Sequence, residues 1–461
     1  MSELPFFLTD WAEAKLGGGR DPLGLQIVWS KLARQGLQGI NSVCGDLTGW
    51  RTLLIGAAIA HELKDEPKKV ILSFERLAAY SKFAAAHANP KKNSHLTKGI
   101  RGKNALDRYP DYGWENIYVS AKDKTTPVLR LLSNQENTGV KGQISGAAMH
   151  LGILTSELRL TSIGQELWDI LKCQTDITTH LHLLKTWLCE GVPIDDTLET
   201  LVIQLTGFTF SCKKEQDWYI KYVLRAEYLK RSSQKPKGWT SSHQEYLSIV
   251  FHTYKRDELF LSNNIVNIDK LGNKVSSLTL SDGTITTDDC VQWLNNIGEI
   301  EQILGLADKV FLWMLFVLRD VHTLDELVDM MKQSDFTILP LTSMDPNGRS
   351  YRILQEIVCE AYPKGKNQKS SIARKILSLV SCSSFKEYIQ TLIDLNILVS
   401  KQRGKLEWLK KQDQGYLCWK HYQISSKHSL PQNTPLNYWY HSYYFPQFYS
   451  LVTETYKGWS S

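Results

Sequence analysis

The residues of this sequence whose types and spacing could do chemistry are mainly lysines and arginines beside turn residues. Toward the carboxyl end, cations gather across a helical pattern and the turn after it: Lys386, Lys401, Arg403, Lys405, Lys410 and Lys411. Such side chains neutralise the phosphates of a nucleic acid without reading its base sequence. We predict that Lys386, Lys401, Arg403 and Lys405 bind DNA or RNA in this way.

A second basic segment spans residues 89–108, where Pro and Gly interrupt the chain and no acidic residue precedes Asp107. Four of its cations are predicted to extend the phosphate-binding track: Lys91, Lys92, Arg101 and Lys103. A solvated surface loop without a ligand has the same composition, so that alternative stays open.

The segment near the carboxyl end is unusually aromatic. Its rings include Tyr438, Trp439, Tyr440, Tyr443, Tyr444 and Phe445. Tyr and Trp are favoured anchors in packed contacts, so we predict that these rings dock the tail onto a partner protein or onto the body of the chain. A stacking platform for single-stranded nucleic acid is the weaker alternative, because no Lys or Arg is interleaved with the rings.

Motifs of known catalytic chemistry are missing from the sequence. It has no phosphate-binding loop of the form Gly-x-x-x-x-Gly-Lys-Ser/Thr, no dinucleotide fingerprint, no nucleophile elbow and no His-Glu-x-x-His. The pairs His180-x-His182 and Cys418-x-x-His421 each lack the second pair that a structural zinc needs. We therefore predict no metal, no cofactor and no catalytic residue, although a divergent nuclease site remains an alternative.

Composition sets the class of protein. The 461 residues carry 54 Lys and Arg against 48 Asp and Glu, and this net charge of +6 permits a polyanionic partner without requiring one. The eight cysteines are scattered and the start lacks a signal peptide, which predicts a reducing, cytoplasmic location. The longest apolar runs, residues 53–60 and 310–318, are too short to cross a bilayer, so no membrane contact is expected.

Helical periodicity dominates the chain, and the predicted fold class is mainly α with small β-hairpins. One helix should begin with Asp21 as its cap and Pro22 at its first position, followed by an apolar stripe that includes Val28 and Trp29. Further helices are predicted near residues 50–63, 70–87, 310–319 and 323–332, with helical periodicity throughout 167–229. Short β-type runs with turn signals predict a hairpin region at 265–285.

Two segments resemble winged-helix units. In residues 126–171, a helix at 127–133 and a second at 142–151 precede a short strand, after which Thr161 would cap the next helix. In residues 371–411, a helix begins at Ser384, a strand is predicted at 396–399, and a turn at 403–404 leads to a returning strand at 406–409. Such units bind nucleic acid in some proteins and pack against other proteins in others.

These patterns suggest four consecutive segments. The first, residues 1–120, is a helical domain with a basic loop, and the second, 121–230, holds a winged-helix-like unit plus helices. The third, 231–370, is a mixed α and β-hairpin region, and the fourth, 371–461, holds the other winged-helix-like unit and the aromatic tail.

The opening, with Gly-Arg-Asp-Pro-Leu-Gly-Leu-Gln at residues 19–26 and Gly-Ile-Asn-Ser-Val at 39–43, resembles the start of uncharacterised bacterial proteins of genome-defence or mobile-element gene clusters. That resemblance covers about 50 residues. It implies a subunit of a multi-protein complex that acts in antiviral defence, with partner proteins encoded in the same gene cluster. Together with the basic residues, it predicts a non-catalytic nucleic-acid-associated or scaffolding subunit. A pure protein-assembly subunit without nucleic-acid contact is the alternative.

Overall fold

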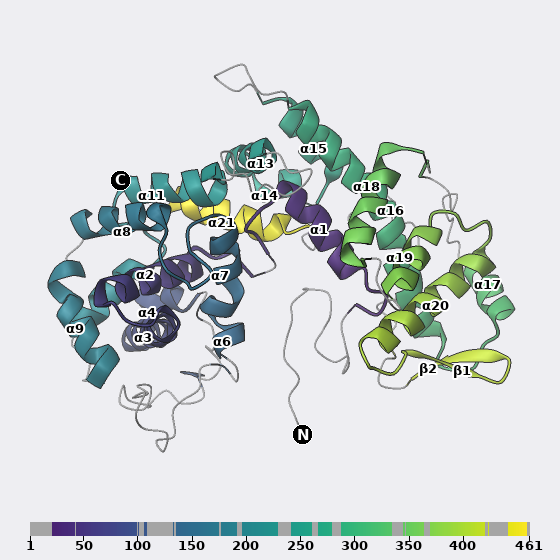
Figure 1. Ribbon diagram of the computed structural model, residues 1–461, viewed down its shortest axis with the longest axis horizontal. Helices are drawn as coiled ribbons and strands as arrows, with labels where there is room; N and C mark the ends of the chain where they lie inside the picture. The colour runs from purple at the N-terminus through teal and green to yellow at the C-terminus, as the bar shows by residue number, and fades with distance from the viewer. Residues whose placement is uncertain are drawn as a thin grey trace. The chain divides into compact units, whose positions relative to one another are not determined.

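The structure is a computed structural model of the chain. It describes residues 21–41, 43–98, 100, 106–107, 132, 135–174, 177–190, 196–228, 241–260, 266–278, 287–333, 344–345, 347–363, 369–419, 423 and 441–458. Within these ranges the protein is mostly helical, with a single two-stranded antiparallel sheet (Figure 1). The predicted fold class, mainly α with a small β-hairpin, is confirmed at this level.

The chain forms two compact units. Unit 1 comprises residues 1–36 and 254–443, and unit 2 comprises residues 37–253 and 444–461. Each unit therefore joins stretches that lie far apart in the sequence, an arrangement that the four consecutive segments predicted above do not include.

Unit 2 is built from helices packed around α2. Its described elements are α2 (Leu47–Leu63), α3 (Pro67–Ala88), α4 (Pro90–Asn93), η1 (Ser94–Thr97), α6 (Gln135–Thr138), α7 (Val140–His150), α8 (Ser162–Gln174), α9 (Ile177–Glu190), α10 (Asp196–Thr206), α11 (Lys213–Tyr219), η3 (Ile220–Leu224), α13 (Ser241–Thr253) and α21 (Phe445–Lys457). Helix α2 is buried from Leu47 to Ala60, because it is apolar on all sides and other helices surround it. The helices predicted at 50–63 and 70–87 are confirmed as α2 and α3.

Two buried cations hold the end of α10 in this unit. Arg51 of α2 pairs with Glu215 at 2.9 Å and also donates to the carbonyls of Gln204, Gly207 and Thr209. Lys82 of α3 donates to the carbonyl of Thr206 at 2.6 Å. The last carbonyls of a helix lack intrahelical partners, so these two side chains satisfy groups that would otherwise be buried without hydrogen bonds.

The first predicted winged-helix segment folds within unit 2 as α7, an isolated bridge between Leu154 and Leu160, and α8. The hydroxyl of Thr161 accepts from the backbone N–H of Gly164, as predicted for a cap. The helix predicted at 127–133 lies outside the described residues.

Unit 1 is organised around the long helix α16. Its described elements are α1 (Gln26–Gly36), α14 (Arg256–Leu259), α15 (Ile268–Ser276), α16 (Asp288–Val317), α17 (Leu324–Gln333), α18 (Arg349–Ala361), α19 (Lys369–Ser378), α20 (Phe385–Gln402), β1 (Leu409–Gln412) and β2 (Gly415–Cys418). Helix α1 packs on α16 and α18, and the approach at its end is close: a Cβ on Gly36 would lie 2.0 Å from the ring of Trp293. Only glycine permits this contact.

Three predictions about unit 1 are wrong in detail. Helix α1 begins at Gln26 instead of Pro22, because Gly24 has a left-handed backbone (φ 72°) that a helix cannot include. The Asp21 side chain accepts from the backbone N–H of Gln26. Residues 268–276 of the predicted hairpin region form helix α15, which Asn267 caps and whose Leu271 and Val275 are buried one turn apart. One of the turn signals of that region, Leu-Gly-Asn at 271–273, therefore lies inside a helix, whereas residues 279–286 lie outside the described ones.

In the second predicted winged-helix segment, the helix that begins at Ser384 is confirmed, and the strand predicted at 396–399 is wrong. Ser384 caps α20 as expected, accepting from the backbone N–H of Glu387. The helix then continues through 396–399, where a strand was predicted, because Asn396 and Val399 are buried on its packed side. The hairpin lies further along, with its strands at 409–412 and 415–418.

Candidate functional site

The hairpin of unit 1 is fixed on one side by a third stretch of backbone. Strand β1 pairs with β2 from Leu409 opposite Cys418 to Gln412 opposite Gly415. On the other side of β2, the N–H of Tyr416 donates to the carbonyl of His322 at 2.8 Å, and the N–H of His322 donates back at 3.1 Å. The N–H of Cys418 also donates to the carbonyl of Leu318. These bonds tie β2 to the end of α16 and the start of α17, so β1 is the outer strand among the residues that the structure describes.

The base of the hairpin is fixed by Asn396 of α20, whose side chain is fully buried. Its Nδ2 donates to the carbonyl of Pro22 at 3.0 Å, and its Oδ1 accepts from the backbone N–H of Trp408 at 3.0 Å. Because one side chain bonds both the segment before α1 and the segment before β1, α20 and the hairpin hold a defined relative position.

Arg403 lies just after α20 and is engaged with Asp21. Its guanidinium is 2.9 Å from the Asp21 carboxylate and also donates to the Asp21 carbonyl at 2.6 Å. Asp21 in turn accepts from the N–H groups of Leu25 and Gln26. Burial raises the pKa of the Asp21 carboxyl to about 6, and the Arg403 guanidinium opposes that rise. Arg403, predicted as a phosphate ligand, is therefore part of the internal frame of unit 1.

Lys386 also has an acidic neighbour. It lies in the first turn of α20, and its Nζ is 2.6 Å from the carboxylate of Asp325 in α17. Both side chains are more than half exposed, so this pair contributes little to stability, yet it offsets the positive charge at that end of α20.

Four other lysines around the hairpin are exposed, and within the described residues they form no ion pair. They are Lys401 at the end of α20, Lys405 in the connection, and Lys410 and Lys411 on β1; we call them the basic hairpin surface. The acids in the same stretch are Glu407, half-buried, and Asp413, exposed at the turn. Successive strand residues face opposite sides, so a linear polyanion that reaches both β1 lysines must follow the outer edge of the hairpin.

Helix α20 itself is poorly placed to enter a groove of duplex DNA. From Tyr388 to Ser400 it is buried or half-buried everywhere except at Ile397, which is 38% exposed. It packs against α16, α17, α19 and β1. Its exposed cations lie at its two ends, and Lys386 at the first end is paired with Asp325. The positive charge available to a ligand therefore lies at the other end of the helix, beside the hairpin.

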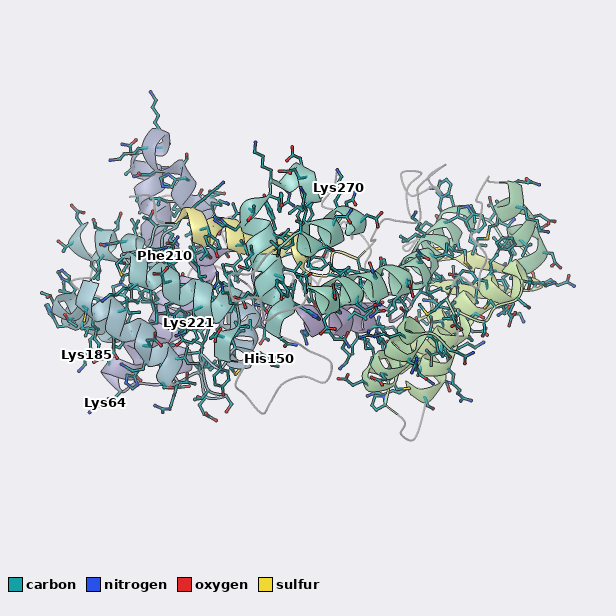
Figure 2. All side chains as sticks on the ribbon, turned by 90° about the horizontal axis from the view of Figure 1, so that it is seen from above. Lys64, His150, Lys185, Phe210, Lys221 and Lys270 are labelled. Atoms are coloured by element: carbon teal, nitrogen blue, oxygen red, sulfur yellow. The ribbon has the colours of Figure 1, made fainter. Side chains whose placement is uncertain are left out.

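The cations of the other predicted segment belong to unit 2. Lys91 and Lys92 are exposed on the short helix α4, whereas Arg101 and Lys103 lie outside the described residues. Lys98 pairs with Glu454 of α21 at 3.0 Å and lies over the ring of Phe208. Other exposed lysines of unit 2, such as Lys185 on α9 and Lys221 on η3, come from separate elements (Figure 2).

The aromatic tail is described only in part. Tyr443, Tyr444 and Phe445 are buried, with exposed fractions of 0, 5 and 0%, while Tyr438, Trp439 and Tyr440 lie outside the described residues. Tyr443 donates to Glu301 within unit 1, and Phe445 meets Phe251 edge-on within unit 2. These three rings are covered by the chain itself, as in the alternative in which the tail docks onto the body.

A charged cluster that the sequence prediction missed lies on α16. Glu301 and Asp308 approach the two ring nitrogens of His441 at 2.9 and 2.8 Å. His441 follows these residues by 140 and 133 positions, so no local pattern links the three. The available signal was the pair of carboxylates seven residues apart, which lie on the same face of the helix.

No metal site is evident in the described part of the chain, since no group of three or more His, Cys, Asp or Glu there could hold an ion. None of the described helices is both long enough and apolar enough to span a membrane. Comparison with protein families, curated proteins and solved structures gives no match to this chain.

Proposed function

We propose that this protein is a non-catalytic subunit that associates with nucleic acid through the basic hairpin surface. Four exposed lysines on a fixed framework are the observation that carries this proposal: Lys401, Lys405, Lys410 and Lys411. The resemblance of the opening residues favours a bacterial, multi-protein setting such as antiviral defence, in which the chain binds or positions the nucleic acid while another subunit supplies the chemistry.

The framework supports contact with phosphates and not with bases. A lysine is a point charge that binds phosphate oxygens, whereas base readout requires side chains inserted into a groove. Because α20 is covered by its neighbours, the ligand meets the edge of the hairpin. Binding should therefore depend weakly on base sequence and strongly on salt concentration.

The order of elements supports a winged-helix-like interpretation of this part of unit 1. Helices α19 and α20 are joined by a short turn, the β1–β2 hairpin follows, and residues 318–322 bond to the far side of β2. In such a unit the hairpin is the wing, and wings commonly contact the phosphate backbone. The first segment, with only an isolated bridge between α7 and α8, gives less support to the same interpretation.

Binding of fluorescently labelled duplex DNA, single-stranded DNA and RNA to the full chain tests this function. We expect binding at 50 mM salt that weakens steeply at 200 mM, with similar affinity for unrelated sequences of one type. Absence of binding to all three at 50 mM salt would contradict the proposal and leave the protein-assembly function as the one to pursue. The relative affinity for the three ligands then identifies the preferred nucleic acid.

A further inference from the structure

Both ring nitrogens of His441 contact carboxylates of helix α16. Nδ1 lies 2.9 Å from Oε2 of Glu301, and Nε2 lies 2.8 Å from Oδ2 of Asp308. The backbone N–H of His441 also donates to Glu301 at 2.9 Å. The Trp29 ring of α1 stacks on the imidazole, with centroids 5.5 Å apart and planes at 22°. With both nitrogens held by carboxylates, the ring has no free atom for a substrate.

The surroundings explain which charge state the ring must carry. The side chains of His441 and Glu301 are 10 and 1% exposed, and that of Asp308 is 32% exposed. Burial alone disfavours an imidazolium, but Glu301 and Asp308 outweigh it and raise the pKa of His441 to about 10. A neutral ring has one N–H and could donate to only one of the two carboxylates, whereas the doubly protonated ring donates to both.

The groups that face this cluster come from several elements. Tyr443, two residues beyond His441, donates its hydroxyl to Glu301. Asp21, before α1, and Tyr388, on α20, interact electrostatically with Asp308. Each of these is acidic or neutral at pH 7, and His441 is the cation placed directly between the α16 carboxylates. Removing it leaves Glu301 buried without that counter-charge.

The residues that follow have an uncommon backbone. Tyr443 and Tyr444 both have positive φ, 47° and 62°, and the chain passes from unit 1 to unit 2 between them. Two consecutive non-glycine residues in this region persist only where surrounding contacts impose the conformation. On the unit 1 side, those contacts are the ones made by His441 and Tyr443 with α16 and α1.

We propose that Glu301, His441 and Asp308 form a charge clamp that locks residues 441–443 onto α16, and that opening this clamp is the step that frees these residues from the rest of unit 1. The clamp is a positioning device, independent of the nucleic-acid function. It holds residues 441–443 in a fixed position within unit 1, although the backbone of Tyr443 has an unfavourable positive φ.

Nuclear magnetic resonance of the full chain labelled with 15N-histidine tests the charge state. We expect one histidine that carries protons on both ring nitrogens at pH 8, well above the usual histidine pKa of about 6.5. The signal should vanish in His441→Gln, which assigns it. A neutral His441 ring at pH 8 in the wild-type protein would overturn the clamp.

Chymotrypsin, which cuts after aromatic residues, tests the locking. Cleavage after Tyr443 or Tyr444 should be slow in the wild type and about tenfold faster in His441→Gln or Asp308→Asn, because cleavage follows the population of locally opened chain. His322→Gln is the matched control, since His322 lies in the same unit and approaches a single exposed carboxylate, Glu326. If His441→Gln fails to fold, the double variant His441→Gln, Glu301→Gln should be used instead. It removes both charges of the buried pair and permits the same measurement. Equal cleavage rates in wild type and clamp variants would overturn the proposal.

Discussion

Asp21 and Arg403 are 382 positions apart in the sequence, yet their side chains meet at 2.9 Å, where the segment before α1 lies beside the residue that follows α20. Removing the guanidinium leaves the buried Asp21 carboxylate without its counter-charge. We predict that Arg403→Ala lowers the free energy of unfolding of unit 1 by about 1–3 kcal/mol, measured by urea denaturation. The variant Lys332→Ala, which removes a cation from an exposed pair with Asp329, should change it by less than about 1 kcal/mol. Comparable losses in the two variants would show that Arg403 does not hold the frame.

The buried pair of Arg51 and Glu215 in unit 2 should behave differently when one or both partners are replaced. Both side chains are fully buried, so Arg51→Met alone leaves a buried carboxylate and should cost about 3–5 kcal/mol. The double variant Arg51→Met, Glu215→Leu should recover part of this loss, because no isolated charge remains. A double variant that is less stable than Arg51→Met would contradict this account of the pair.

Stability should depend on pH through His441. Its pKa is raised in the folded state, so the folded protein binds more protons than the unfolded chain between pH 6.5 and about 10. The contribution of His441 is therefore complete below pH 6.5 and is lost as the pH rises toward 10. The free energy of unfolding should be measured for wild type and His441→Gln across pH 6–10, and the difference between the two should shrink as the pH rises from 6.5 to 10. Parallel curves would refute it.

Lys82 should change the stability with pH in the direction opposite to His441. Burial lowers its pKa to about 7, although the charge of Asp46 opposes this. Between pH 7 and about 10.5 the unfolded chain binds more protons, so the stability of unit 2 should rise with pH in this range. The variant Lys82→Met should remove the rise, as followed by thermal unfolding, and a rise of equal size in that variant would assign it to other groups.

The sequence predicted those elements whose burial follows from local periodicity. Helix α2 was predicted because its sequence is rich in Ala and Leu, and helix α3 because its apolar residues recur on one face. Helix α15 was missed because Gly272 and Asn273 are typical of turns. In the structure, a Cβ at Gly272 would meet nothing within 4 Å, so no close contact requires glycine at this helical position. The end of α20 was missed because Asn396 reads as a strand boundary until its tertiary partners, Pro22 and Trp408, are known.

The candidate site was predicted only in part, for a similar reason. The lysines can be listed from the sequence, and the structure shows that Lys401 and Lys405 are exposed. The acids that engage Arg403 and Lys386 are distant in sequence, so no local pattern shows that Asp21 and Asp325 lie beside them. The same holds for Glu301, Asp308 and His441, which long-range folding brings together.

Rigidity of the hairpin gives a prediction that links stability to function. A Cβ on Gly415 would lie 2.7 Å from the carbonyl oxygen of His322, so Gly415→Ala should disturb the bonds that hold β2 to residues 318–322. We expect a loss of stability of about 1–3 kcal/mol and weaker nucleic-acid binding. Gly272→Ala, which meets no neighbour within 4 Å, should leave both unchanged or raise stability slightly. Equal behaviour of the two variants would contradict a fixed hairpin.

The salt dependence of nucleic-acid binding tests the central claim most directly. The logarithm of the binding constant should be measured against the logarithm of salt concentration for wild type, for a variant with Lys401, Lys405, Lys410 and Lys411 all replaced by Ala, and for Lys270→Ala, which removes another exposed lysine of unit 1. The account predicts that the fourfold variant binds more weakly and that its slope is shallower by about 3–4, while Lys270→Ala matches the wild type. A fourfold variant with unchanged affinity and slope would contradict it.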